Sequence, residues 1–154
     1  MPEHIYDGGW EHFVGGGLAI LDCNGDTRPD IVAAGGSNPP ILLRNLSMAG
    51  GALLFEDATP PALDLPDTTG AYPLDINNDG LLDLVMLRVG PDVVLHGDGD
   101  CGFTRAPPDT GDHWSTAFSA TWEAGNSQPT LAFGHYVDRA DPEGPFGACD
   151  SSTL

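Results

Sequence analysis

The stretch Asp75-Ile76-Asn77-Asn78-Asp79-Gly80-Leu81-Leu82-Asp83 places oxygen-bearing side chains at its first, third, fifth and ninth positions. The same spacing begins at residue 22, in Asp22-Cys23-Asn24-Gly25-Asp26-Thr27-Arg28-Pro29-Asp30. Ca²⁺ takes about six to eight oxygen ligands, and a tight loop supplies them from alternating side chains and one main-chain carbonyl. Each stretch is therefore predicted to bind one Ca²⁺. The predicted ligands are Asp22, Asn24, Asp26, the Arg28 carbonyl and Asp30 in the first loop, and Asp75, Asn77, Asp79, the Leu81 carbonyl and Asp83 in the second.

The EF-hand loop opens in the same way, but it requires a Glu at its twelfth position and a helix on each side. Here the twelfth positions are Ala33 and Met86. Apolar runs at 31–34 and 84–87 follow the loops, and short runs bounded by Gly or Pro favour strands. A single such loop could also be an acidic turn without metal. Two copies with matching flanks favour calcium.

The charge of the chain is one-sided, with 5 Lys and Arg against 23 Asp and Glu and a formal net charge of −18. Such a field repels phosphate backbones and anionic lipid surfaces, so we expect no nucleic-acid partner and no direct membrane insertion. A length of 154 residues favours one domain. No apolar run reaches the roughly 20 residues of a membrane-spanning helix, and the first residues do not resemble a signal peptide. Any export signal is expected to have been removed or never to have been included.

Three cysteines allow one disulfide and one free thiol. Cys23 takes the loop position that Ile76 takes in the second loop, so its side chain is expected to point into the core as a small hydrophobe. Cys101 and Cys149 both lie in glycine-rich turn segments, and we predict that they pair. The alternative of two free thiols depends on the redox compartment.

The chain is predicted to be all-β, a single partial β-propeller domain of repeated units of four antiparallel strands. Four short strands repeating every ~40 to 50 residues are typical of propeller blades. The expected strands are 18–21, 31–34, 41–44 and 53–56 in a first unit (13–59), 70–74, 84–88, 92–95 and 101–104 in a second (68–107), and 117–121 and 131–134 in a third (115–154).

The third unit has lost the ligand pattern. Its loop places Trp122, Ala124, Asn126 and Thr130 where the other loops carry Asp or Asn. We expect side-chain packing, through Trp122, to replace the ion. The chain then holds about two and a half blades, an incomplete ring, since closed propellers need about four or more. Open strand edges invite pairing, so residues 1–154 alone are not expected to be a monomer.

Other residues receive plainer interpretations. The Asp98 and Asp100 pair favours a hairpin turn over a cation site. Asn45-Leu46-Ser47 matches a glycosylation acceptor. The tryptophans favour packing between blades over a sugar-stacking platform. The five histidines are scattered singly, without the paired spacing of a zinc site: His4, His12, His96, His113 and His135.

Four segments carry a resemblance to the FG-GAP/VCBS repeat family, at residues 15–22, 54–59, 75–85 and 131–138. The chain most resembles the amino-terminal part of bacterial proteins of the CRTAC1 (ASPIC/UnbV) type, over most of residues 13–150. That family is similar to the integrin α-subunit head, which implies a secreted or periplasmic propeller with calcium in rim loops. The first loop departs from the family pattern at Thr27, where Gly is usual because the backbone needs a left-handed conformation. The first site is therefore expected to bind calcium more weakly.

Two classes of function follow. The first is a structural or protein-interaction module, completed by further blades or a partner chain, with a protein or a glycan as its ligand. The second is a calcium-dependent hydrolase or lyase that acts on extracellular polymers. The sequence shows no nucleophile–base pairing and no paired acid motif outside the loops, so the expectation is a module rather than an enzyme.

Overall fold

The computed structural model describes residues 11, 16–108, 110–138, 140, 150–152 and 154. Within them the chain is all-β, as predicted, with antiparallel strands and one short 3₁₀ helix. The elements are β1 (Leu18–Leu21), β2 (Asp30–Gly35), β3 (Asn38–Asn45), β4 (Phe55–Asp57), η2 (Pro61–Leu63), β5 (Thr68–Leu74), β6 (Asp83–Gly90), β7 (Val93–Gly97), β8 (Phe103–Ala106), β9 (His113–Thr121) and β10 (Thr130–His135).

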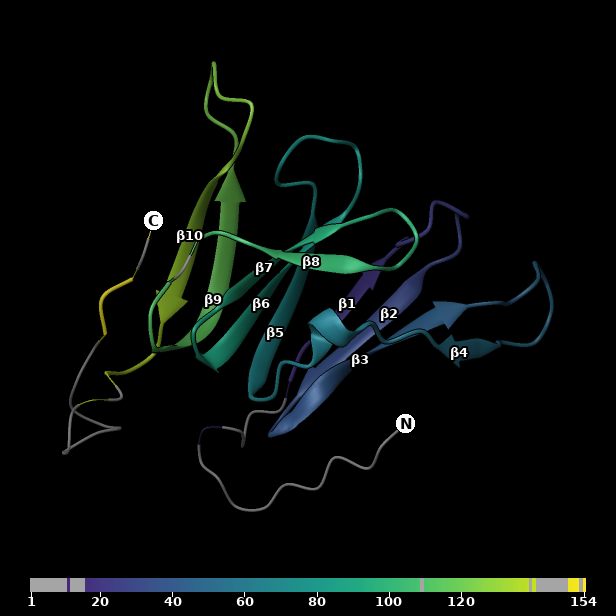
Figure 1. Ribbon diagram of the computed structural model, residues 1–154, viewed down its shortest axis with the longest axis horizontal. Helices are drawn as coiled ribbons and strands as arrows, with labels where there is room; N and C mark the ends of the chain where they lie inside the picture. Colours follow the sequence, from purple (N-terminus) through teal and green to yellow (C-terminus); the bar gives the residue numbers. More distant parts are fainter. Residues whose placement is uncertain (1–10, 12–15, 109, 139, 141–149, 153) are drawn as a thin grey trace.

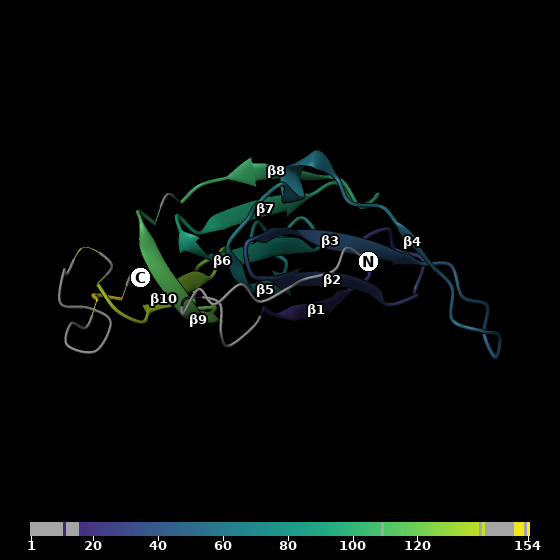
Figure 2. The ribbon, with the colours of Figure 1, turned by 90° about the horizontal axis from the view of Figure 1, so that it is seen from below.

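The strands form three blade-like groups that lie side by side (Figure 1). β1 to β4 make one antiparallel meander, and β5 to β8 make a second. The hairpin of β9 and β10 is the third group, joined to β6 where Val89 pairs with Trp114 and Gly90 with His113. The view turned by 90° shows β1 to β4 and β9 to β10 on opposite sides of the middle group (Figure 2). The arrangement is that of an incomplete propeller.

β6 shows why the middle group is covered on both faces. Successive side chains of a strand point to opposite faces of the sheet. Leu84 and Met86 pack in one buried cluster with Leu21, Val32 and other residues of the first group. Val85 and Leu87 pack in a second cluster with Phe133 of the third group. The continuous apolar run 84–87 is therefore the sequence of a strand between two cores.

In the first group, as far as the described residues show, the face turned away from the middle group is only partly covered: Ala33 and Ile41 on it are buried, whereas the β1 side chains are exposed. In the middle group, the cross-strand row Pro73, Leu84 and Leu95 faces the first group, and Leu84 and Leu95 are fully buried. The matching row of the first group is Ile20, Ile31 and Leu43. Its Ile20 is 57% exposed, and Leu18 beside it on β1 is 72% exposed. The β1 end of this row is thus open in the first group, while Ile31 and Leu43 are half-buried.

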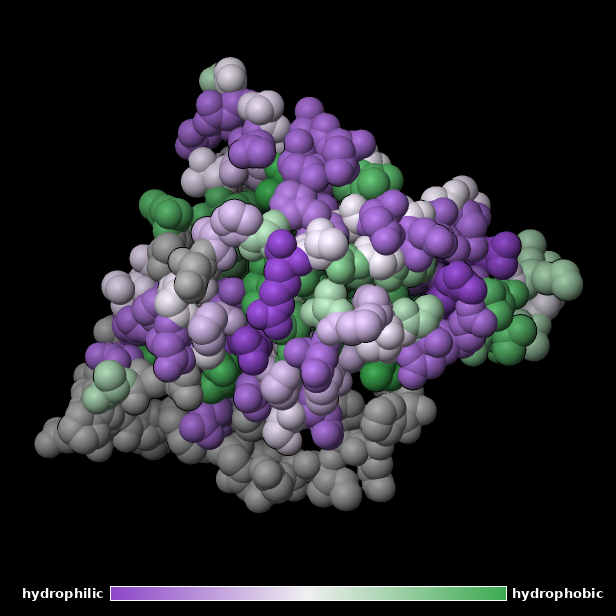
Figure 3. Space-filling view, in the orientation of Figure 1, coloured by the Kyte–Doolittle hydropathy of each residue, from purple (hydrophilic) through white to green (hydrophobic). Residues whose placement is uncertain are grey.

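The strand predictions are confirmed, with shifts at the ends. β4 begins at Phe55 rather than at Leu53, and β9 begins at His113 rather than at Ala117. The largest surprise is the long connection from β3 to β4, whose Met48, Leu53 and Leu54 side chains are exposed. Figure 3 shows apolar surface at the end of the molecule where this loop lies.

The disulfide prediction is wrong for Cys101. The structure joins Cys101 to Cys23, with their Cα atoms 4.7 Å apart. Cys23 does point into the core, but the turn between β7 and β8 packs against it, and the Cys101 amide donates to the Cys23 carbonyl at 3.1 Å. Cys149, the predicted partner, lies outside the described residues. Sequence spacing could not show that this turn of the second group reaches the first loop.

Candidate metal centres

The two predicted calcium loops occupy the same place in their groups. Residues 22–29 connect β1 to β2, and residues 75–82 connect β5 to β6. Residues 122–129 connect β9 to β10 in the same way. The three loops have equal length, so the alignment of the third loop with the other two is correct.

In the second loop, backbone amides gather the oxygens of the first and third positions. The Asp79 amide donates to Asp75 Oδ1 at 3.1 Å and to Asn77 Oδ1 at 3.0 Å. The Gly80 amide donates to the other Asp75 oxygen at 2.9 Å. Because two side-chain oxygens share one N–H donor, they lie close together on the inside of the turn.

The first loop repeats this pattern bond for bond. The Asp26 amide donates to Asp22 Oδ1 at 3.1 Å and to Asn24 Oδ1 at 3.2 Å. The Thr27 amide donates to Asp22 Oδ2 at 2.7 Å. Two segments far apart in sequence thus build the same cradle of oxygen atoms.

The fifth-position carboxylates, of half-buried Asp26 and exposed Asp79, are each held by the amide two residues later. The Arg28 amide donates to Asp26 at 2.9 Å, and the Leu81 amide donates to Asp79 at 2.8 Å. These bonds lower the pKa of Asp26 and of Asp79, with the neighbouring Asn side chain adding to the effect. A carboxylate that stays ionised is the form that a divalent cation binds.

The ninth-position aspartates have a different environment, since both are fully buried. Asp83 accepts the Ile76 amide at 2.8 Å and the Gly97 amide at 3.0 Å. Asp30 accepts the Cys23 amide at 2.9 Å and the Asn45 amide at 2.8 Å. Asp30 therefore links the first loop to the end of β3, and Asp83 links the second loop to the end of β7. The sequence did not indicate this structural role.

The structure does not draw all three aspartates of a loop into one cluster. Among the described residues, the group of three acidic, thiol or imidazole side chains whose ligand atoms lie within 4.8 Å of one another is Cys23, Asp30 and Cys101. The oxygens of positions one and three converge, whereas position nine is turned towards backbone amides. The donor set is still the hard-oxygen set that Ca²⁺ prefers, so the loops fit this ion in chemistry.

The left-handed conformation expected at position six is present in both loops. Thr27 has φ of 68° and Gly80 has φ of 85°. Position four is also left-handed, with Gly25 at 71° and Asn78 at 61°. A β-branched residue resists this conformation, so Thr27 is a strained position of the first loop.

Replacing Thr27 with Gly is expected to stabilise the chain by about 1 kcal/mol, because glycine adopts φ near +70° without steric cost. The reciprocal change, Gly80→Thr, is expected to destabilise it by a similar amount. Urea unfolding of both variants in a calcium chelator measures the backbone effect alone. If Thr27→Gly and the unchanged chain unfolded at the same urea concentration, the backbone at Thr27 would not be strained.

The third loop does not carry an oxygen cradle of this kind. Trp122, at the first position, is 55% exposed, so the prediction that it packs in place of an ion is wrong. The loop is instead closed by a turn in which the Asn126 amide donates to the Glu123 carbonyl at 3.1 Å. Gly125 supplies the left-handed residue of that turn.

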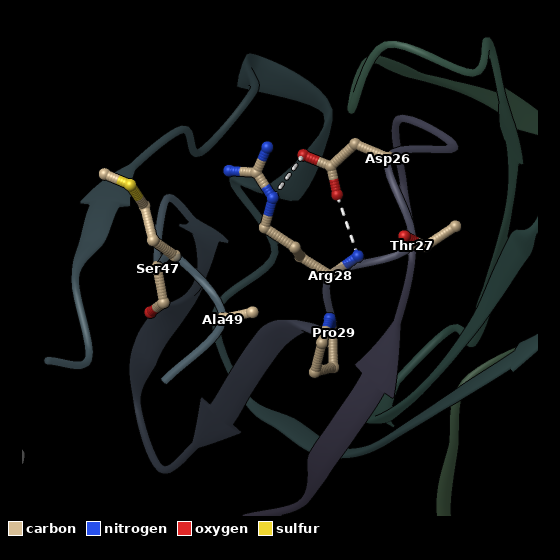
Figure 4. A pocket seen from close by; sticks show the side chains of 7 residues that line it. Asp26, Thr27, Arg28, Pro29, Ser47 and Ala49 are labelled. Atoms are coloured by element: carbon tan, nitrogen blue, oxygen red, sulfur yellow. Dashed lines mark hydrogen bonds and ion pairs between the residues drawn. The ribbon is translucent and has the colours of Figure 1, made fainter. Parts of the chain in front are cut away.

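A shallow pocket lies beside the first loop (Figure 4). One wall is the loop segment Asp26 to Pro29, and the other is Ser47, Met48 and Ala49 from the connection between β3 and β4. The Arg28 side chain lies 3.7 Å from the Asp26 carboxylate. The pocket is thus open to solvent and borders the oxygen cradle.

Two sequence interpretations are resolved by contacts. Asp98 Oδ1 accepts the amides of Asp100 and Gly102 at 2.8 and 2.9 Å, which is a turn, as expected. Asn45 is buried, and its Nδ2 donates to the Pro29 carbonyl at 3.0 Å. The nitrogen that would carry a glycan therefore anchors the first loop.

Sequence reasoning missed a polar network in the interface between the second and third groups. The Ser115 hydroxyl donates to Asp92 at 2.7 Å and lies 2.8 Å from His135 Nδ1. The His135 ring stacks on His113 with centroids 4.0 Å apart. Burial raises the pKa of Asp92. Burial also lowers the pKa of His135, and the neighbouring His113 lowers it further.

This network resembles a nucleophile, base and acid in composition only. Ser115 is fully buried, so a substrate cannot reach its hydroxyl in this structure. The network holds β9 and β10 against the turn before β7. No sequence signal pointed to it, because its members lie in the turn before β7, on β9 and on β10, and meet only in the fold.

Fold and loops together define a propeller-like repeat protein with paired acidic loops. Residues 22–86 match the family model of the FG-GAP-like repeat. This match supports a relationship of the chain to the FG-GAP repeat family, and the matched segment contains both loops. The comparison with curated proteins gave no match. Among the described residues, no helix is long and apolar enough to cross a membrane.

Proposed function

We propose that this chain is a calcium-stabilised FG-GAP repeat segment of a secreted or periplasmic protein, and that it serves as a structural and interaction module. Its relatives would be the ASPIC/UnbV type of repeat protein. The observation that carries the proposal is the repetition of one hydrogen-bond pattern in two loops. In both loops, the side-chain oxygens of the first and third residues accept the backbone amide of the fifth residue. The carboxylate of the fifth residue in turn accepts the backbone amide of the seventh.

Calcium would act on these loops by removing charge repulsion. Each loop holds three aspartates at neutral pH, and like charges at short range oppose the closed turn. A bound cation reverses this term and ties the first strand of a blade to the second. Extracellular modules bind calcium with dissociation constants of about 10⁻⁴ to 10⁻³ M. At ten times that concentration, each site would stabilise the fold by roughly 1.4 kcal/mol.

Calcium in excess is therefore expected to raise the melting temperature by roughly 5–10 °C. Asp79→Ala should remove more of this rise than Asp26→Ala, since the strained Thr27 weakens the first site. Differential scanning calorimetry with calcium and with chelator measures both effects. Magnesium is the ionic control, because it demands tighter octahedral geometry. A melting temperature that does not respond to calcium would contradict the proposal.

The partner we propose is further blades of the same kind, from the rest of a longer chain or from another chain. The row Ile20, Ile31 and Leu43 of the first group takes the register positions of the row that the first group covers in the second. Its β1 member, Ile20, is 57% exposed. Equivalent positions of a repeat need equivalent cover. Sedimentation velocity should show association of the isolated chain, and Ile20→Asp should reduce it. A monomer unaffected by this change would contradict the inference.

A further inference from the structure

The disulfide between Cys23 and Cys101 lies inside the first loop. Cys23 is the second residue of that loop, and Cys101 belongs to the turn between β7 and β8 of the second group. Both side chains are buried, at 6% and 5% exposed. The bond therefore fixes the first loop to a neighbouring blade.

The same sulfur contacts a predicted calcium ligand. Cys23 Sγ lies 3.0 Å from Asp30 Oδ2, the oxygen that also accepts the Cys23 amide at 2.9 Å. A disulfide sulfur carries no proton, so in the oxidised chain it donates nothing to this carboxylate. A thiol at the same place could donate its proton to Oδ2. The redox state of Cys23 thus decides how many donors Asp30 receives.

We propose that the Cys23–Cys101 disulfide is a redox-sensitive constraint on the first loop, whose reduction weakens calcium binding there and not at the second loop. The proposal rests on the calcium function proposed above. A dithiol supplies two electrons and two protons: the sulfur–sulfur bond breaks, two thiols form, and the dithiol becomes a disulfide.

Reduction acts in two ways on the first loop. The Cys23 thiol competes with a cation for the Asp30 oxygen, and the link that holds the loop to the second group is lost. A hydrogen bond to a charged group of this kind corresponds to a change in affinity of about tenfold.

The second loop is a built-in control. Its equivalent of Cys23 is Ile76, whose side chain has no donor, and Asp83 Oδ2 accepts the Ile76 amide at 2.8 Å. The hydrogen bonds of this carboxylate, from the Ile76 and Gly97 amides, involve neither cysteine. A redox effect that is confined to the first loop distinguishes the proposed coupling from general loosening of the fold.

The coupling must be reciprocal, because linkage between two equilibria works in both directions. If reduction weakens calcium binding, then bound calcium must disfavour reduction. Since both sulfurs are buried, a reductant reaches them only when the loop opens. Calcium at the first loop should therefore slow reduction as well.

The binding test uses the full chain with Cys149→Ser, which prevents disulfide exchange, and with Asp79→Ala, which leaves the first loop as the reporter. Calorimetric titration of the oxidised protein, and of the protein reduced by dithiothreitol, gives the two affinities. We expect affinity about tenfold weaker after reduction. Equal affinities in the two states would overturn the proposal while leaving the calcium function intact.

The kinetic test does not require the reduced protein to stay folded. The rate of disulfide reduction by dithiothreitol is measured with calcium and with chelator. Calcium should slow reduction in Asp79→Ala, whose first loop is intact, and not in Asp26→Ala. Identical rates with and without calcium in Asp79→Ala would overturn the proposal. Failure of the unchanged protein to bind calcium in either redox state would instead overturn the calcium function itself.

Discussion

Replacing Asp83 with Ala should lower the free energy of unfolding by about 3–5 kcal/mol, even without calcium. The carboxylate is fully buried and accepts two backbone amides, from Ile76 and Gly97. Alanine leaves both donors without their charged acceptor and removes the link between the second loop and the end of β7. Urea unfolding in a chelator isolates this structural contribution from any effect of an ion.

Asp79→Ala is the matched control for this variant. Asp79 lies in the same loop, but it is exposed, and its bonds stay within the turn. In chelator it should therefore cost much less than Asp83→Ala. Asp83→Asn, which keeps one acceptor oxygen, should fall between the two. If Asp83→Ala unfolded in chelator at the same urea concentration as the unchanged chain, the buried carboxylate would not stabilise the fold as described.

Leu84→Ala should cost about 2–5 kcal/mol, the range found when a fully buried leucine is truncated. Leu84 is the β6 residue that follows Asp83, and it is fully buried in the cluster between the first and second groups. Because β6 is paired with β5 on one side and with β7 on the other, the site has little freedom to collapse around the cavity. The two groups should loosen from each other as a result.

Thermal unfolding in chelator measures this loss, with Leu81→Ala as the control. Leu81 is a partly exposed leucine in the preceding loop, so its truncation should change stability only slightly. Hydrogen exchange at β2 and β6 should rise together in Leu84→Ala. Wild-type stability in this variant would show that the two groups do not share a core.

The strands and the connecting loops could be predicted from residues alone because their signals are local. The short apolar run after Asp83 favoured a strand, and the structure confirms the strand and places its side chains in two clusters. The left-handed backbone at Thr27 was expected from the resemblance to the repeat family, in which Gly is usual at this position, and the structure confirms it.

The features that sequence did not reveal depend on contacts between blades. The pairing of Cys101 with Cys23 needs the β7–β8 turn to reach the first loop, and residue spacing carries no such distance. The Asp92, Ser115 and His135 network is likewise assembled from three separate elements. The ninth-position carboxylates were predicted as ligands, but their bonds to strand backbones could be found only in the fold.

Isothermal titration of calcium into the oxidised chain tests the central claim most directly, because it counts ions. The expected stoichiometry is two per chain, falling to one in Asp26→Ala and to one in Asp79→Ala, with the tighter site lost in Asp79→Ala. A titration that shows no binding at millimolar calcium, or a stoichiometry that neither substitution changes, would contradict the assignment of these two loops as calcium sites.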